Sequence, residues 1–215
     1  MNCCARHIGS ARSCFGWMSR MYERRYRRKG LDKNQRGLLD ALVAYDVEGA
    51  RLLEVGCGVG ELHQTLLQRG AAQAFGVDLA PSMLEVAETR ARERGLHDQT
   101  EYRLGDFVEI IEEVPVADVT VLDKVVCCYP APVALLGAAL SRTRRVVALS
   151  YPKRNRFTIV WNALWNLGFW LLRSDFRGFV HSSSLVENTL RDAGLTKVYE
   201  HNSALWHNQV FVLAR

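Results

Sequence analysis

Residues 51–60 read Arg-Leu-Leu-Glu-Val-Gly-Cys-Gly-Val-Gly, and this stretch decides the fold of the chain. An apolar strand runs directly into a turn with glycine at every second position, and a helical pattern over residues 61–68 follows. Glycines at this spacing let the backbone adopt positive φ and let a ligand lie against bare main chain. The next strand ends in an acid, Asp78. A strand, a glycine turn, a helix and a strand with a terminal acid are typical of one half of a nucleoside-binding sheet.

The details of the turn favour one adenosine-containing cofactor over another. A dinucleotide site has the spacing G-x-G-x-x-G, whose third glycine would fall here at Glu61. The glycines instead follow G-x-G-x-G, with Glu54 two residues before the first. A carboxylate at that place would repel a pyrophosphate but attract the cationic amino-acid end of S-adenosylmethionine. The turn therefore predicts S-adenosylmethionine, with a ligand-free tight turn as the alternative.

The segment resembles motif I of the class I S-adenosylmethionine-dependent methyltransferases, and the order of motifs over residues 51–150 follows that family. The resemblance implies that Asp78 accepts the ribose hydroxyls, that the loop from Leu79 to Met83 covers the adenine, and that Asp106 in Gly105-Asp106-Phe107 accepts the adenine amino group. It also implies that residues 117–122 are the fourth strand. The cofactor-binding residues expected from it are Glu54, Gly56, Cys57, Gly58, Gly60, Asp78, Leu79, Met83, Gly105, Asp106, Phe107, Asp123 and Lys124.

Over its full length the chain is more loosely similar to magnesium-protoporphyrin O-methyltransferases and related small-molecule methyltransferases. The shared features are a basic N-terminal helix, a Tyr-Pro pair after the fourth strand, an aromatic helix after the fifth strand and an aromatic last strand. None of these features specifies a substrate.

The rest of the chain alternates between strand and helix patterns. Strands are expected at 51–55, 73–77, 100–103, 117–122, 145–150, 196–201 and 206–213, and helices at 60–69, 82–94, 107–112, 131–140, 155–172 and 182–193. This alternation predicts an α/β fold with helices on both faces of the sheet. We expect a Rossmann-like, doubly wound, seven-stranded and mostly parallel sheet whose last strand is antiparallel. We expect residues 37–215 to form the methyltransferase domain and residues 1–36 to form a basic extension that is helical or partly disordered.

Composition indicates an ordinary globular protein, with 48% hydrophobic and 24% charged residues in a length of 215 that suits one domain. No secretory signal and no transmembrane segment are expected, because the first 20 residues hold three arginines and no sustained apolar run. The cysteines follow no disulfide framework. These features predict a cytoplasmic protein, and they leave peripheral contact with a membrane open.

Charge is concentrated at the N-terminus. Residues 1–36 carry ten Arg or Lys against Glu23 and Asp32, a net of +8, so the remaining residues sum to −3 within the total of +5. The basic stretch is either a solvated helix face or an arm that attracts an anionic partner: a substrate carboxylate, a membrane surface or RNA. The nearby Cys3, Cys4, His7 and Cys14 lack the spacing of structural zinc ligands, so no metal site is expected.

The segment 157–172 places Trp161, Trp165 and Phe169 at helical spacing. It is shorter than the ~20 apolar residues that span a bilayer. Three interpretations remain open for it: a helix packed on the sheet, a lid over a flat apolar substrate, and an interfacial membrane helix aided by upstream basic residues.

Methyl transfer from a sulfonium needs an acceptor held in line near the methyl group, and the acceptor is expected at the carboxyl ends of the fourth and fifth strands. The candidate catalytic residues there are Tyr129, Tyr151 and His181. Each also has a structural interpretation, because the tyrosines begin Tyr-Pro turns and His181 precedes a serine-rich helix start.

The sequence predicts an S-adenosylmethionine-dependent methyltransferase that modifies an oxygen, a carboxylate or a hydroxyl, of a small apolar, aromatic or tetrapyrrole-like acceptor. One alternative is an RNA or protein methyltransferase that uses the basic arm; nucleic acid is disfavoured because residues 127–130 read Cys-Cys-Tyr-Pro instead of the Asn/Asp-Pro-Pro-Tyr/Phe tetrad of amino-methylating enzymes. Another is a catalytically silent, cofactor-binding partner subunit.

Overall fold

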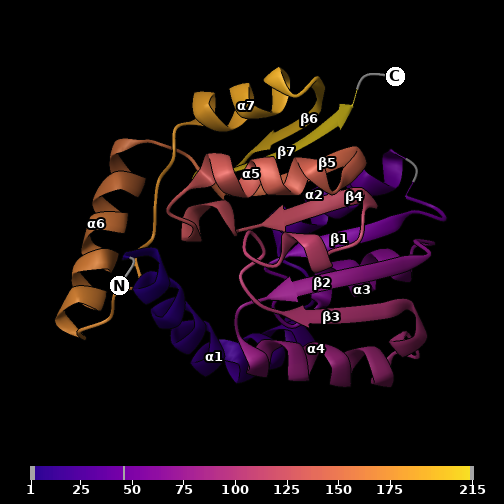
Figure 1. Cartoon of the computed structure of the whole chain (residues 1–215), viewed down its shortest axis with the longest axis horizontal. Coiled ribbons are helices and arrows are strands. Elements are labelled where there is room, and N and C mark those ends of the chain that lie inside the picture. The colour runs from indigo at the N-terminus through magenta and orange to yellow at the C-terminus, as the bar shows by residue number, and fades with distance from the viewer. Residues whose placement is uncertain (1–2, 46, 214–215) are drawn as a thin grey trace.

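A computed structural model describes residues 3–45 and 47–213, apart from the side chains of residues 3–6. One seven-stranded sheet in the order β3-β2-β1-β4-β5-β7-β6 forms the centre of the molecule (Figure 1). The strands are β1 (Arg51–Val55), β2 (Gln73–Asp78), β3 (Thr100–Leu104), β4 (Ala117–Asp123), β5 (Thr143–Pro152), β6 (Leu195–Asn202) and β7 (Trp206–Leu213). The first five strands pair in parallel, and β7 runs antiparallel to both of its neighbours. The predicted fold class is confirmed.

Helices cover both faces of the sheet. They are α1 (Cys3–Lys29), α2 (Lys33–Ala44), α3 (Glu61–Leu67), α4 (Pro81–Glu93), α5 (Pro132–Ser141), α6 (Arg156–Leu171) and α7 (Ser183–Asp192). Buried side chains of α2 and α3 share one core cluster with the sheet, and those of α5 and α7 share a second cluster. In Figure 1, α1 and α6 lie together at one side of the molecule, beyond the carboxyl ends of the parallel strands.

Consecutive residues of the central strands alternate between the two core clusters. Leu52 packs in the first cluster and Leu53 in the second, and Val210 and Phe211 divide in the same way. This is the period of two that a strand imposes on its side chains. Because both faces are covered, most buried residues of these strands are apolar on both sides, as in other buried parallel sheets.

One segment differs from the sequence expectation, and at the N-terminus the structure decides between two alternatives. The helix expected over 107–112 is wrong: residues 107–110 are turns, and a single 3₁₀ turn follows at Ile111–Glu113. The buried carboxylate of Asp106 explains the turn, because it accepts the backbone N–H of Val108 at 3.0 Å, and such local bonds compete with a helix. The basic N-terminal stretch is one continuous helix, α1, from Cys3 to Lys29.

Candidate functional site

A cavity of about 290 Å³ opens at the carboxyl ends of β1, β2 and β4, beneath α1. The predicted site residues that line it are Glu54, Gly56, Cys57, Gly58, Asp78, Leu79, Met83, Asp123, Lys124 and Tyr129. The carboxyl edge of a parallel sheet is where the fold places ligands, because the strand order reverses there and the loops diverge. The cavity thus gathers residues from three separate motifs around one space.

The glycine turn needs the positive φ that its sequence predicts. Gly56, Gly58 and Gly60 have φ of 63°, 53° and 76°. A Cβ added to Gly58 would meet no heavy atom of the protein within 4 Å, whereas one on Gly60 would lie 2.6 Å from the Gln64 amide nitrogen. Gly58 therefore presents bare backbone to the cavity, while Gly60 begins α3 and does not line the cavity.

Asp78 ends β2 as a buried acid whose position is set by backbone amides. Its Oδ2 accepts the N–H of Gly58 at 2.8 Å and its Oδ1 accepts the N–H of Ala80 at 2.9 Å. Burial raises the pKa of the Asp78 carboxyl to about 6, and the two amide bonds oppose that rise. Each carboxylate oxygen can accept more than one hydrogen bond, so Asp78 retains acceptor capacity toward the cavity it lines.

Glu54 has a partner that the sequence analysis did not identify. Its Oε2 accepts from the ring Nδ1 of His63 at 2.5 Å and from the backbone N–H of the same residue at 3.2 Å. The other ring nitrogen, Nε2, lies 2.9 Å from the hydroxyl of Tyr102. Burial raises the pKa of Glu54, and the bond to His63 opposes that rise. The His63 tautomer with Nδ1 protonated satisfies both contacts, donating to Glu54 and accepting from Tyr102.

Asp123 joins the sheet to the N-terminal helices. Its Oδ1 accepts the Ser150 hydroxyl of β5 at 2.5 Å, and its Oδ2 accepts the Gln35 side-chain amide of α2 at 2.8 Å. Gln35 also donates to the Tyr26 hydroxyl at 2.9 Å. The neighbouring Lys124, with φ of 60°, donates to Asp32, the N-cap of α2, at 2.5 Å. A strained residue beside a cavity is common at functional sites, where surrounding contacts hold the strain.

The Asp32–Lys124 pair is electrostatically matched. Burial raises the pKa of Asp32, but the hydrogen bonds from Lys124 and from the backbone of Gln35, together with the nearby charges of Lys124 and Arg25, hold that pKa below its usual value. Burial likewise opposes charge on Lys124, yet the carboxylates of Asp123 and Asp32 raise its pKa. Both groups are therefore ionised at neutral pH, and the pair holds α2 against the end of β4.

An aromatic stripe of α1 roofs the cavity, and the sequence analysis missed it. Phe15, Tyr22 and Tyr26 line the space, and together with Met18 they pack on Val59 and Met83. The spacing of Phe15, Met18, Tyr22 and Tyr26 is three, four and four, which is one face of a helix. That period was the signal available in the sequence, but the surrounding arginines directed attention to charge.

Three of the predicted cofactor-binding residues do not line the cavity: Gly105, Asp106 and Phe107. The Asp106 carboxylate accepts the hydroxyl of Tyr129 at 3.1 Å, and Tyr129 lines the cavity. Phe107 is buried in the second core cluster, and a Cβ on Gly105 would clash with Ile110. Tyr129 thus connects the cavity to Asp106.

The other two catalytic candidates do not line the cavity. Tyr151 is buried in the second core cluster, where its hydroxyl donates to Gln209 at 3.0 Å. His181 lies after α6, with Nε2 3.0 Å from the carbonyl oxygen of Tyr129, and burial lowers the pKa of its ring. His181 reaches the site only through the backbone of Tyr129, and the roles predicted for both residues stay predictions.

The expectation of no metal site concerns cysteines that the structure describes only in part. The side chains of Cys3 and Cys4 lie outside the described residues. Among the side chains that are described, no three of His, Cys, Asp or Glu gather as a metal-binding group.

The comparisons with known proteins agree with this geometry. Residues 52–149 match the family model described as a methyltransferase domain. A ubiquinone biosynthesis O-methyltransferase of Xanthomonas euvesicatoria pv. vesicatoria is 34% identical over 101 residues, which are 45% of this chain and 39% of that protein. The chain therefore spans about two fifths of the length of this curated relative.

Solved structures resemble the chain over nearly its whole length. The magnesium protoporphyrin IX methyltransferase of Synechocystis PCC 6803, with bound S-adenosylhomocysteine, superposes with a TM-score of 0.69 at 21% identity, covering 92% of this chain and 97% of that one. An O-methyltransferase family 2 protein of Planctomyces limnophilus, in complex with apigenin, has a TM-score of 0.68 at 21% identity, covering 91% and 62%. At 21% identity these structures show the fold, and the match of residues 52–149 to the methyltransferase domain model confirms the predicted resemblance over that segment.

The Gln35 bridge makes a testable structural prediction. Replacing Gln35 with Leu removes the bonds from its side chain to Asp123 and Tyr26, leaves the Asp123 Oδ2 without that donor, and removes the capping-box bond that its Oε1 accepts from the N–H of Asp32. We expect the free energy of unfolding to fall by about 1–3 kcal/mol, and amide hydrogen exchange to accelerate in α1 and α2 first. Gln68→Ala, at an exposed position after α3, is the matched control and should change neither. Unchanged exchange in α1 and α2 would show that the bridge does not hold these helices.

Proposed function

We propose that the chain, whose residues 52–149 form a methyltransferase domain, binds S-adenosylmethionine in the cavity beneath α1 and transfers its methyl group to an oxygen of a small apolar acceptor. The observation that carries this proposal is the junction of Gly58 and Asp78. A buried acid held by a backbone amide of the glycine turn opens, with that turn, on one cavity of about 290 Å³. The solved neighbour from Synechocystis contains S-adenosylhomocysteine at its own site.

Each wall of the cavity matches a different part of this cofactor. Asp78 would accept the ribose hydroxyls, and Leu79 and Met83 would flank the adenine. The bare backbone at Gly58 would meet the amino-acid end, with Glu54 below it. The aromatic stripe of α1 would close the cavity over the ligand and exclude water, which strengthens electrostatic interactions inside the site.

The transfer is an in-line displacement. The bond between sulfur and the methyl carbon breaks as the bond between the acceptor oxygen and that carbon forms, and the bonding pair stays on sulfur to leave the neutral thioether S-adenosylhomocysteine. A carboxylate acceptor needs no base, whereas a phenol must lose its proton. Tyr129 is our candidate for relaying that proton, because Tyr129 lines the cavity and its hydroxyl donates to Asp106 at 3.1 Å. The proton would end on the Asp106 carboxylate.

An oxygen acceptor on a flat apolar molecule is supported by two observations. The roof of the cavity is built from Phe15, Tyr22 and Tyr26, whose rings suit a planar apolar ligand. The relative from Xanthomonas is named for O-methylation in ubiquinone biosynthesis, and the neighbour from Planctomyces holds apigenin. Fold alone would not distinguish acceptors, because one fold hosts many reactions.

A substitution at Gly58 should remove ligand binding while the fold is retained. The Cβ of a valine there would meet no protein atom within 4 Å and would occupy the cavity that Gly58 lines, so the variant should lose S-adenosylhomocysteine binding in calorimetry. Positive φ adds strain of about 1–3 kcal/mol for a residue other than glycine. Gly95→Ala is the matched control, since Gly95 also has positive φ, 70°, and open space around it but does not line the cavity. A Gly58→Val variant that binds as tightly as wild type would place the ligand elsewhere.

The carboxyl of Asp78 should make cofactor affinity depend on pH. Its pKa in the free protein is raised to about 6, and ribose hydroxyls donate to the ionised form. Affinity should therefore be complete well above pH 6 and fall as the pH drops through it, by about tenfold at pH 5. Asp78→Asn should bind more weakly at neutral pH, by about 1–3 kcal/mol, and lose the step near pH 6. A step of equal size in Asp78→Asn would assign the titration to another group.

The methyl acceptor is tested with S-adenosylmethionine labelled in its methyl group. We expect label in organic extracts when phenols or carboxylic acids with planar apolar bodies are supplied, with a product heavier than the acceptor by one methyl group in place of hydrogen. Label in added RNA, combined with RNA binding that falls steeply as salt rises, would favour the nucleic-acid alternative. Binding of the cofactor without transfer to any acceptor would favour the silent partner subunit.

Once an acceptor is known, Tyr129→Phe tests the proton relay. With a phenolic acceptor we expect kcat to fall by about 10²-fold or more with little change in KM. A carboxylate acceptor should be affected far less, because it carries no proton to remove. Equal losses with both kinds of acceptor would make Tyr129 a structural residue.

A further inference from the structure

The helix α6 turns its polar face toward the protein and its apolar face toward solvent, the opposite of an ordinary surface helix. Toward the protein it turns Thr158, Asn162 and Asn166: Thr158 is buried, and both asparagine amides donate to the carbonyl oxygen of Gly178 at 2.9 Å. The N–H of Gly178 donates back to Asn166 Oδ1 at 2.8 Å. A surface helix normally packs its apolar stripe on the core and shows its polar side to water. Polar bonds hold α6 in place, so its apolar side chains remain available.

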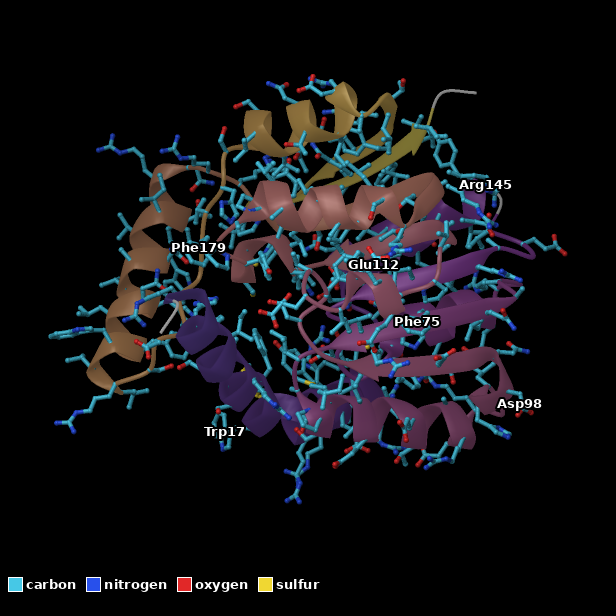
Figure 2. All side chains as sticks on the ribbon, viewed as in Figure 1. Trp17, Phe75, Asp98, Glu112, Arg145 and Phe179 are labelled. Atoms are coloured by element: carbon cyan, nitrogen blue, oxygen red, sulfur yellow. The ribbon has the colours of Figure 1, made fainter. Side chains whose placement is uncertain are left out.

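The outward face of α6 is almost wholly apolar. Its exposed members and the tail that follows are Phe157, Ile159, Val160, Trp161, Leu164, Trp165, Leu167, Trp170, Leu171 and Leu172, which are 45% to 78% exposed. Figure 2 shows side chains of this helix projecting away from the rest of the molecule. Single exposed apolar residues are ordinary, but a continuous apolar face of this extent marks an interaction surface.

Charge around this face is mainly positive, with Asp175 after the helix as the exception. Residues 153–174 contain no Asp or Glu, and exposed arginines stand at both ends of the helix: Arg154 and Arg156 before it and at its start, and Arg173 after it. Tryptophan rings with a long apolar face and flanking cations are the composition of helices that lie in the plane of a membrane interface. Anionic headgroups attract the cations while the rings enter the boundary of the acyl chains.

A second copy of the chain fits this face less well. Two α6 helices packed in parallel would set Arg154 and Arg156 against their own copies, and packed antiparallel would set them against Arg173. Either arrangement juxtaposes like charges, and the single exposed acid beside them, Asp175, balances only part of the charge of three arginines, which is costly at an interface. Among residues 3–45 and 47–213, no helix is long and apolar enough to cross a membrane. A helix that lies in the plane of an anionic bilayer avoids the like-charge contacts and does not need to span the membrane.

We propose that α6 docks this protein on the surface of an anionic lipid bilayer. Trp161 and Trp170 insert beside the acyl chains, and Arg154, Arg156 and Arg173 contact the headgroups. The neighbouring α1 adds Trp17, which is 84% exposed and projects from the outer edge of the molecule (Figure 2). The segment after α6 joins these helices, because Phe176 packs on Phe169 of α6 and on Phe15 of α1 with ring centroids 5.0 and 5.4 Å apart. Docking therefore brings the roof of the cavity near the lipid, although the inference does not depend on methyl transfer.

Vesicle flotation of the full chain tests the proposal. We expect it to float with vesicles of phosphatidylcholine and phosphatidylglycerol and much less with phosphatidylcholine alone. Replacing Trp161 and Trp170 together with Gln should lower the partition coefficient by about tenfold or more. The matched control is Leu185→Gln on α7, a residue 41% exposed, which should leave partition unchanged. Circular dichroism of each variant verifies that the fold is retained.

Two further measurements separate the contributions of charge and of ring insertion. Replacing Arg154 and Arg156 with Gln should lower partition into anionic vesicles by about fivefold per charge, and added salt should weaken wild-type binding. Brominated lipid should quench the tryptophan fluorescence of wild-type protein, a readout that needs no variant. Absence of binding to anionic vesicles, or equal binding by the double tryptophan variant, would overturn the proposal. So would a lipid-free dimer, seen by light scattering, that this variant dissociates.

Discussion

The carboxylate of Asp123 is the contact on which the arrangement of the site depends. It ends β4 and takes hydrogen bonds from Ser150 on β5 and from Gln35 on α2. A buried acid is stable only when its acceptor positions are filled, so the bonds that satisfy Asp123 also fix the first helices against the edge of the sheet. The capping box of α2 uses Gln35 a second time, through its own backbone and Asp32. Asp32 in turn holds Lys124, so one short network sets the ends of two strands and the start of α2.

That network gives the cavity two unlike walls. The sheet edge supplies the polar groups, with Asp78 and Glu54 each held by amides or a ring nitrogen of the adjoining segment. The helix α1 supplies the rings of Phe15, Tyr22 and Tyr26 together with Arg25, and its exposed arginines do not line the cavity. The basic stretch is thus amphipathic, with an apolar face that packs on the site. Charge and cavity formation are properties of one helix rather than alternatives.

The helix α6 is also amphipathic, but it packs on the protein through its polar face. Its asparagines bond to the backbone of Gly178, and this polar attachment leaves an aromatic face outside. Phe176 packs between α6 and α1, so it connects the helix that bears the outward apolar face to the helix that roofs the cavity. An acceptor that is apolar would be concentrated where such a face meets lipid, which gives the proposed chemistry and the proposed docking surface a common physical basis.

The sequence by itself determined the parts of this protein that depend on neighbours along the chain. Apolar strands alternating with helices predicted the seven-stranded sheet, and the spacing of Gly56, Gly58 and Gly60 predicted a turn of positive φ beside Asp78, because backbone geometry follows from local residues. Tertiary structure alone decided which polar groups meet across the fold. Gln35 and Asp123 are 88 positions apart, and His63 reaches Tyr102 over 39. It also placed Tyr151 in the core and turned the polar side of α6 inward. Periodicity shows that a helix has two faces, but which face is buried depends on the partner that packing brings to it.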